Sequence, residues 1–259
     1  MASGRSTVVS SFTVIKGSMI EETYSVLRGW DFELTIGANL QEMKHTNAVG
    51  AKSENWLRDV YKVLHRRFDP NSKDKPLADL AKAGMPLDIW KPILLWHMTR
   101  DEFLVRDFLV SWLFPQFAAG ALVLRTEELH PYFADLQKRG IIQAPWKETT
   151  VQRVASGLLR MGVDFGLLEG TLARRFRSYH LPEESFLYLL HAMAELQPNA
   201  REVVQSPDWR MYLMDSHDVE RELFRLHQFR KLRYEVAGSM AQLTLPCGSL
   251  EEYVKEMAR

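Results

Sequence analysis

The sequence predicts a mainly α-helical protein made of small helical domains, with helix-turn-helix and winged-helix-like units and short β-hairpins near the C-terminus. Two observations support this fold class. Apolar residues recur at the three- and four-residue spacing of helices through most of the 259 residues. Alternation with a period of two is clear only near the end, at 232–236. The composition, 46% hydrophobic and 25% charged, excludes a disordered or collagen-like chain.

The helices follow one another closely. In chain order, the expected ranges are 19–27, 31–43, 52–68, 77–83, 86–98, 101–114, 126–138, 148–161, 183–196, 201–204, 207–214, 216–229 and 249–257. The clearest of them is 52–68, because its apolar residues follow the helical period on one face. That face consists of Leu57, Val60, Tyr61, Leu64 and Phe68.

Strands are expected in two places. The segments 232–236 and 240–245 predict a hairpin that turns at 237–239, and 165–170 can turn into a strand after the helix at 148–161. Turn-forming residues fill 69–76, which is the clearest loop. We therefore expect three parts: residues 1–75, residues 76–182 with the winged-helix-like unit, and residues 183–259 with the C-terminal hairpin.

One uncharged stretch resembles a membrane span but lacks the length and regularity that a bilayer requires. Residues 108–124 carry no formal charge, but they are short for a bilayer and contain Pro115, so a buried helix pair broken at Pro115 is expected. No secretory signal is recognisable at the N-terminus. The lone Cys247 excludes an intramolecular disulfide, and the reducing cytoplasm is the expected compartment.

Motifs of enzymes are missing from the sequence. Residues 50–53 only faintly resemble a phosphate-binding loop, because the required glycine spacing is absent. The eight histidines are scattered without the spacing of metal ligands. We therefore expect no catalytic activity, no metal and no cofactor.

The middle of the chain predicts a nucleic-acid-binding unit. The helix at 148–161 has one apolar face, and its opposite face carries Thr149, Gln152, Arg153, Ser156 and Arg160. Three further cations follow the helix at Arg174, Arg175 and Arg177. A helix pair followed by a basic turn is typical of a winged helix, whose second helix enters the major groove while the wing contacts the backbone.

Two other basic surfaces are candidates for the same role. The C-terminal unit carries Arg221 and Arg225 on a helix face, then Arg230, Lys231 and Arg233 on its hairpin. The N-terminal helix at 52–68 would present a third set to phosphates: Lys52, Arg58, Lys62, Arg66 and Arg67. Each surface has an ordinary alternative. A basic helix face can be merely solvated, the C-terminal unit can dock a protein, and the N-terminal helices can form a bundle that packs on a partner.

Two segments resemble a known family. The first is the sequence SFTVIKGSMIEET at 11–23 with the helix pair that ends in LHRRF at 64–68. The second is the tail with SPDWR at 206–210, DVE at 218–220 and the closing hairpin. Together they resemble BrxA, the small component of BREX bacteriophage-exclusion systems, over nearly the whole chain. The resemblance implies an all-α protein with helix-turn-helix and winged-helix-like parts, and a non-enzymatic, DNA-binding role in a bacterial defence locus that includes a methyltransferase and ATPases.

The leading hypothesis is therefore a DNA-binding accessory protein of a phage-defence system, which contacts duplex phosphates and works with the other BREX components. Because 33 basic residues balance 33 acidic ones, such binding must come from local clusters of charge. The alternative is an adaptor that binds protein partners without recognising DNA itself. RNA binding is a third possibility, disfavoured by the lack of exposed aromatic stacking motifs. The oligomeric state stays open.

Overall fold

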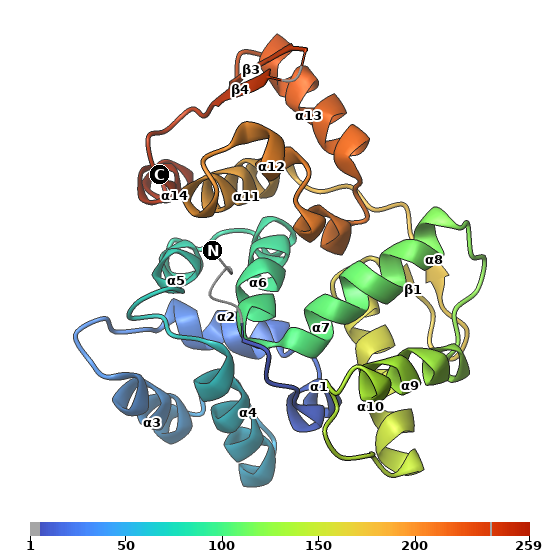
Figure 1. The fold of residues 1–259 in the computed structure, drawn as a ribbon. Helices are drawn as coiled ribbons and strands as arrows, with labels where there is room; N and C mark the ends of the chain where they lie inside the picture. The colour runs from blue at the N-terminus through green and yellow to red at the C-terminus, as the bar shows by residue number, and fades with distance from the viewer. Residues whose placement is uncertain (1–5, 239) are drawn as a thin grey trace.

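The computed structural model of the chain describes residues 6–238 and 240–259. Helices dominate it, as the sequence predicts (Figure 1). In chain order they are α1 (Ser11–Lys16), α2 (Ile20–Arg28), α3 (Ile36–Thr46), α4 (Glu54–Arg67), α5 (Lys75–Lys82), α6 (Leu87–Asp101), α7 (Phe103–Asp107), the π-helix η1 (Phe108–Leu113), α8 (Phe114–Ala118), the 3-10 helix η2 (Thr126–Leu129), α9 (His130–Lys138), α10 (Glu148–Asp164), α11 (Glu183–Leu196), α12 (Ala200–Val204), the 3-10 helix η3 (Pro207–Tyr212), α13 (Ser216–Gln228) and α14 (Leu250–Met257).

Two antiparallel hairpins complete the described part of the chain. The first joins β1 (Leu168–Glu169) to β2 (Arg175–Phe176), and Leu124 adds an antiparallel bridge to Arg174 at the start of β2. The second joins β3 (Arg233–Ala237) to β4 (Met240–Thr244), in which Tyr234 lies opposite Leu243. Both hairpins confirm the expected strands, although the first is shorter than the range 165–170.

Three expectations about helices need correction. The range 31–43 begins only at Ile36, because the Thr35 hydroxyl accepts a hydrogen bond from the Ala38 N–H and starts the helix there. Helix α1 was not expected at all. The expected break at Pro115 is wrong, because α7, η1 and α8 run on without interruption (Figure 1). The wider π-helical turn of η1 directly precedes Pro115, whose missing N–H would leave one α-helical hydrogen bond unmade.

One hydrophobic core joins all three predicted parts of the chain. Its buried residues run from Val14 in α1 to Val254 in α14, and they include the fully buried Trp90 and Trp209. The predicted boundary near residue 75 falls at the first residue of α5, and the one near residue 182 falls at the N-cap of α11. The division into 1–75, 76–182 and 183–259 itself stays a prediction.

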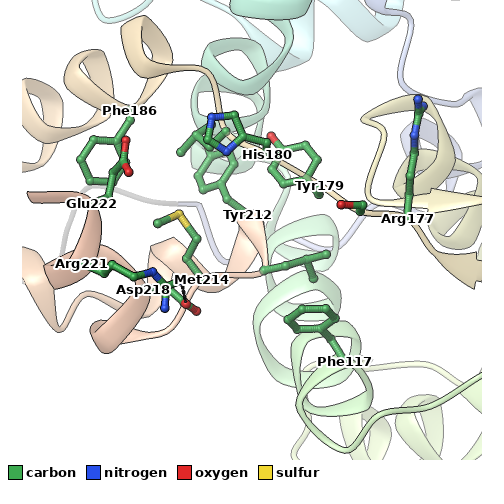
Figure 2. Close-up of a pocket in the computed structure, with 13 residues that line it drawn as sticks. Phe117, Arg177, Tyr179, His180, Phe186, Tyr212, Met214, Asp218, Arg221 and Glu222 are labelled. Carbon is green, nitrogen blue, oxygen red and sulfur yellow. Dashed lines mark hydrogen bonds and ion pairs between the residues drawn. The ribbon is translucent and has the colours of Figure 1, made fainter. Parts of the chain in front are cut away.

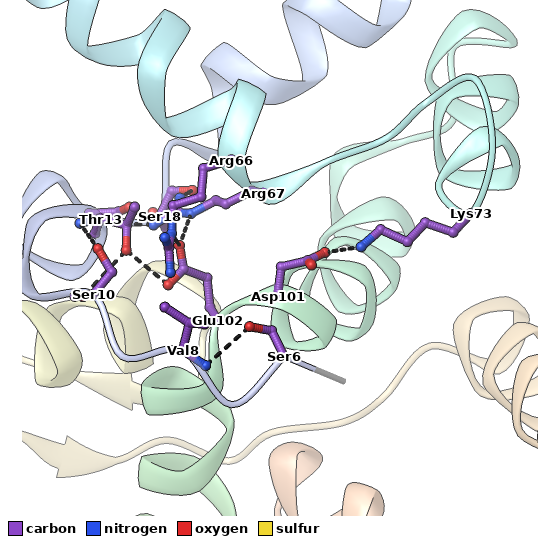
Figure 3. Close-up of polar contacts among 11 residues, drawn as sticks. Ser6, Val8, Ser10, Thr13, Ser18, Arg66, Arg67, Lys73, Asp101 and Glu102 are labelled. Carbon is purple, nitrogen blue, oxygen red and sulfur yellow. Dashed lines mark hydrogen bonds and ion pairs between the residues drawn. The ribbon is translucent and has the colours of Figure 1, made fainter. Parts of the chain in front are cut away.

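A buried ion pair holds α1 against α4 and the junction of α6 and α7 (Figure 3). Arg67 Nε donates to Glu102 Oε1 at 3.1 Å, and the Thr13 hydroxyl donates to Glu102 Oε2 at 2.8 Å. The remaining guanidinium donors reach the carbonyls of Thr13, Gly17 and Ser18 at 2.9–3.0 Å. Burial lowers the pKa of Arg67, and the Glu102 carboxylate opposes that shift. The expectation that Arg67 faces phosphates is therefore wrong, because its side chain is fully buried.

A second buried polar chain connects the loop before α5 to α6 and α11. His97 Nδ1 lies 2.6 Å from Asp74 Oδ1, and His97 Nε2 lies 2.7 Å from the Tyr188 hydroxyl. A carboxylate only accepts, so the Nδ1–H donates to Asp74 and Nε2 accepts from Tyr188. Burial raises the pKa of Tyr188 well above its usual value, so its hydroxyl keeps the proton that it donates.

Helix α14 covers a histidine whose burial makes folding pH-dependent. His191 is 2% exposed and stacks on Tyr253 of α14 with 4.7 Å between ring centroids, and its Nε2 is buried without a hydrogen-bond partner. Burial lowers the pKa of His191 from 6.5 to about 4. The unfolded chain therefore binds the proton more readily, so stability is complete above about pH 6.5 and falls as the pH drops toward 4.

We expect acidification through that window to cost about 3 kcal/mol of unfolding free energy from this residue alone. Urea titrations at about pH 7.5 and about pH 4 measure it, with His191→Phe as the comparison because phenylalanine keeps the stack and does not titrate. The variant should lose less stability than the wild type between the two pH values. An equal loss in both proteins would show that other groups control the acid sensitivity.

Candidate nucleic-acid interface

Helix α10 presents a narrow polar stripe to solvent. Its apolar side is buried, and the exposed residues Thr149, Arg153, Ser156 and Arg160 follow one another at spacings of three or four. Gln152, which was predicted on the same face, is half-buried and donates to Glu148 Oε1 at 3.2 Å. The stripe therefore consists of two guanidinium groups and two hydroxyl groups, with Gln152 at its edge.

The flank of α10 is covered by α1. A Cβ at Gly157 would lie only 2.7 Å from the Val14 carbonyl oxygen, so glycine is what allows the two backbones to approach so closely. Helix α1 also contacts α4 on its other side, through an ion pair of 2.5 Å between Lys16 and Asp59. Figure 1 shows α4, α1 and α10 in this order. The packing fixes the stripe of α10 at a set distance from α4.

The β1–β2 hairpin follows α10 directly and carries the three predicted arginines. Arg175 and Arg177 are exposed, whereas the Arg174 side chain points inward and its residue is only 6% exposed. The Arg174 Nε is buried without a hydrogen-bond partner, and burial lowers the pKa of Arg174. Gly170, at φ +97°, makes the tight turn that lets the hairpin close.

Two adjoining clefts bring Arg160 and Arg177 near a lysine that the sequence analysis missed. A cleft of about 330 Å³ is lined by Arg160 and Lys91, and a neighbouring cleft of about 460 Å³ is lined by Lys91 and Arg177. Acidic residues share these clefts, among them Asp164, which accepts a hydrogen bond of 2.6 Å from Ser18. The clefts therefore join the end of the α10 stripe to the segment after β2.

The four exposed arginines on α10 and around the β1–β2 hairpin have no acidic partner in the described part of the chain. No carboxylate lies within ion-pair distance of Arg153 or Arg160 on the helix, nor of Arg175 or Arg177 after it, so far as residues 6–238 and 240–259 go. Their charges are open to an external anion.

The C-terminal cations are arranged differently. Arg225 donates to Glu222 at 2.6 Å and to Glu183 at 2.8 Å, and these hydrogen bonds raise the pKa of Arg225. The other pairs are Arg221 with Asp218 at 2.5 Å, Lys231 with Glu183 at 3.4 Å and Arg233 with Glu235 at 2.9 Å. Only Arg230 among the five predicted residues here has no acidic partner in the described chain. This surface is locally neutralised.

The third predicted surface lies on α4. Lys52, Arg58, Lys62 and Arg66 are exposed, as predicted from the helical period. Arg58 donates to the Asn55 side chain at 3.1 Å, and Arg66 leans toward the buried Glu102, with 3.9 Å between Nε and Oε1. These cations form a separate basic strip beyond α1.

The family model of BrxA matches residues 11–192, more than two-thirds of the chain. The chain belongs to the BrxA family. Membership implies a role in BREX phage defence. No curated protein and no solved structure matches this BrxA chain.

Neither a group of metal ligands nor a membrane-spanning helix is found among the described residues of this BrxA chain. Between residues 6 and 259, leaving out 239, no three His, Cys, Asp or Glu side chains are grouped so that they could hold a metal ion. Within the same residues, every helix is too short or too polar to span a lipid bilayer.

Proposed function

We propose that this BrxA family member binds double-stranded DNA through the α10 stripe and the β1–β2 hairpin, as a non-enzymatic accessory protein of its BREX system. The observation that supports this choice is the contrast in pairing. The arginines of α10 and the hairpin have no carboxylate partner in the described chain, whereas four of the five predicted C-terminal cations are already paired. Unpaired guanidinium groups are free to replace the counterions of phosphates.

The order of elements around α10 also supports the proposal. A helix (α7 to α8), a strand residue (Leu124), a second helix (η2 and α9), a third helix (α10) and a hairpin (β1–β2) follow one another. Winged-helix domains have this order, and the second helix of their helix-turn-helix pair, here α10, enters the major groove while the hairpin contacts the backbone. In this arrangement, Arg153 and Arg160 would face the groove edge, and Arg175 would lie on the wing.

Arg174 adds a further argument for an anionic partner. The Arg174 Nε is buried without a hydrogen-bond partner, and burial lowers the pKa of this arginine, so a nearby anion would stabilise its charge. A DNA phosphate has the charge and the acceptor oxygens that this position lacks.

A second candidate function concerns the C-terminal unit. Its cations are neutralised, yet it exposes large apolar side chains, with Phe229 at 65% and Met240 at 72%. Phenylalanine and methionine are enriched at protein–protein interfaces relative to the rest of the surface. We propose that this unit docks another BREX component, such as the methyltransferase or an ATPase, so that DNA binding and assembly use different surfaces.

Fluorescence anisotropy with a labelled duplex tests the DNA proposal. The wild type should bind tightly at about 50 mM salt and lose most of its affinity at about 200 mM, because bound counterions are released. The double variant Arg153→Ala/Arg160→Ala should bind at least about tenfold more weakly, and its log–log salt slope should fall by about 2, one for each lost phosphate contact.

The matched control is Lys231→Ala/Arg233→Ala, which removes the same number of cations from the neutralised surface. It should leave both the affinity and the salt slope unchanged. If the control weakens binding and the α10 variant does not, the interface lies in the C-terminal unit. If neither matters but Arg58→Ala/Lys62→Ala abolishes binding, it lies on α4. No binding at about 50 mM salt would leave the docking function alone.

A further inference from the structure

A cleft of about 580 Å³ lies where the middle of the chain meets the C-terminal unit. One wall comes from α8 and the extended segment 177–181, and the other comes from η3, the residues after it and α13. Figure 2 shows Phe117 on one side, with Met214, His180 and the Asp218–Arg221 pair around the same space. The volume is within the range of sites that hold a small organic ligand.

The acceptors of this cleft are occupied by the protein itself. Asp218 Oδ1 accepts from Arg221 at 2.5 Å, and its Oδ2 accepts from the Asp215 N–H at 3.1 Å. Both oxygens of Glu222 accept from Arg225, at 2.6 and 2.9 Å. The two carboxylates that line the cleft therefore have little capacity left to bind a donor from a ligand.

The donors of the cleft are not occupied. Ser178, Tyr179 and His180 lie on the extended segment, and their side chains have no hydrogen-bond partner within the described residues. Arg221 uses only its Nη2 on Asp218, which leaves its other N–H groups free. A ligand for this cleft must therefore bring acceptors, and an anionic group suits it best.

The remaining walls are apolar and aromatic. Phe117 is 39% exposed, and its ring is fixed by an edge contact with Phe176 at 5.2 Å between centroids. Met214 and the buried Tyr212 face it from the other wall (Figure 2). A fixed and half-exposed aromatic ring is a platform on which a flat ring can stack.

The backbone beside Met214 is strained. Leu213 has φ 57° and ψ 30°, a left-handed conformation that a branched side chain rarely adopts. Such strain persists where the surrounding structure enforces it, and it concentrates at binding sites. Here it turns the chain from η3 toward α13 and so shapes the wall of the cleft.

We propose that this cleft binds a nucleoside phosphate, with the base stacked on Phe117 and the phosphate held by His180 and Arg221. The ligand is either a free nucleotide or one nucleotide of a single strand, since both have the same chemistry. This inference goes beyond duplex binding and does not depend on it, because neither Phe117, His180 nor Arg221 belongs to the proposed duplex interface; Arg177 alone lies at both sites.

Isothermal titration calorimetry of the full chain with AMP, adenosine and inorganic phosphate is the test. AMP should bind, and adenosine or phosphate alone should bind at least about tenfold more weakly. Adenosine can only stack on Phe117, and phosphate can only contact His180 and Arg221. Phe117→Ala and His180→Ala should each weaken AMP binding by about tenfold. The control Arg230→Ala lies outside the cleft and should have no effect.

A short deoxyadenosine oligonucleotide distinguishes the two sources. Tighter binding of the oligonucleotide than of AMP, lost in Phe117→Ala, would assign the cleft to single strands, and the reverse order would assign it to free nucleotides. The proposal is overturned if neither probe binds at about 1 mM, or if binding survives both cleft variants. An acidic peptide that contains phenylalanine is the comparison ligand. The proposal is also overturned if this peptide binds the cleft and neither AMP nor the oligonucleotide does. Duplex affinity, measured in the same variants, should stay unchanged.

Discussion

Replacement of Arg67 by methionine is expected to lower the free energy of unfolding by about 3–5 kcal/mol. The variant leaves the Glu102 carboxylate buried without its counterion and removes the donor to three backbone carbonyls in and after α1. Methionine fills a similar volume, so the loss reports mainly the uncompensated polar groups and only a small cavity. Urea denaturation at neutral pH, followed by circular dichroism, measures it.

The adjacent Arg66→Met variant is the matched control. Arg66 is exposed and lies 3.9 Å from the same Glu102 oxygen, so it removes an equal charge without exposing any buried group. We expect a change below about 1 kcal/mol. Equal losses in the two variants would contradict the buried pair as the source of the stability.

Replacement of Asp74 by alanine is expected to cost about 4 kcal/mol. Two donors would lose their acceptor: the buried His97 Nδ1–H, now 2.6 Å from Oδ1, and the half-buried Asp69 N–H, now 2.7 Å from Oδ2. Unsatisfied buried donors cost about 1–3 kcal/mol each, and the loop before α5 would also lose its anchor on α6. The readout is again the urea midpoint at constant slope.

Asp69→Ala is the comparison, in the same loop and with the same change of side chain. Asp69 is half-buried. Its N–H and its carbonyl oxygen make the hydrogen bonds that the structure gives this residue, and the substitution keeps both groups. It should change stability by less than about 1 kcal/mol. If Asp69→Ala proves as damaging as Asp74→Ala, the loop conformation and not the His97 contact determines the cost.

The helical fold was predictable because long amphipathic segments impose a clear period, as in α4 and α13. Helix α1 was missed because it has only six residues, and short helices depend on packing more than on their own sequence. Proline at position 115 suggested a break, yet the π-helical turn of η1 precedes it, and a sequence period does not reveal such a turn.

The candidate site was predictable only in part. The sequence gives the type of each side chain, but it does not give the direction in which that side chain points in the fold. Arg67 belongs to the buried face of α4 by its spacing from Val60 and Val63, but its charge suggested solvent. Arg174 and Arg175 are neighbours on a strand, and alternation places one inside and one outside without telling which. Lys91 lies in a helix that is otherwise largely buried, and only folding brings it near Arg160.

The contacts of α1 also constrain the order in which the chain can complete its fold. Glu102, the partner of Thr13, is synthesised 89 residues after it, and Asp164, the partner of Ser18, is synthesised 146 residues after it. At ordinary rates of synthesis, the ribosome needs on the order of ten seconds to deliver the second partner. During that interval, Val14 lacks the α10 surface that covers it in the finished protein. A nascent chain that stops before α10 therefore leaves exposed the side of its first helix that faces α10 in the finished protein, although α4 is already present on the other side.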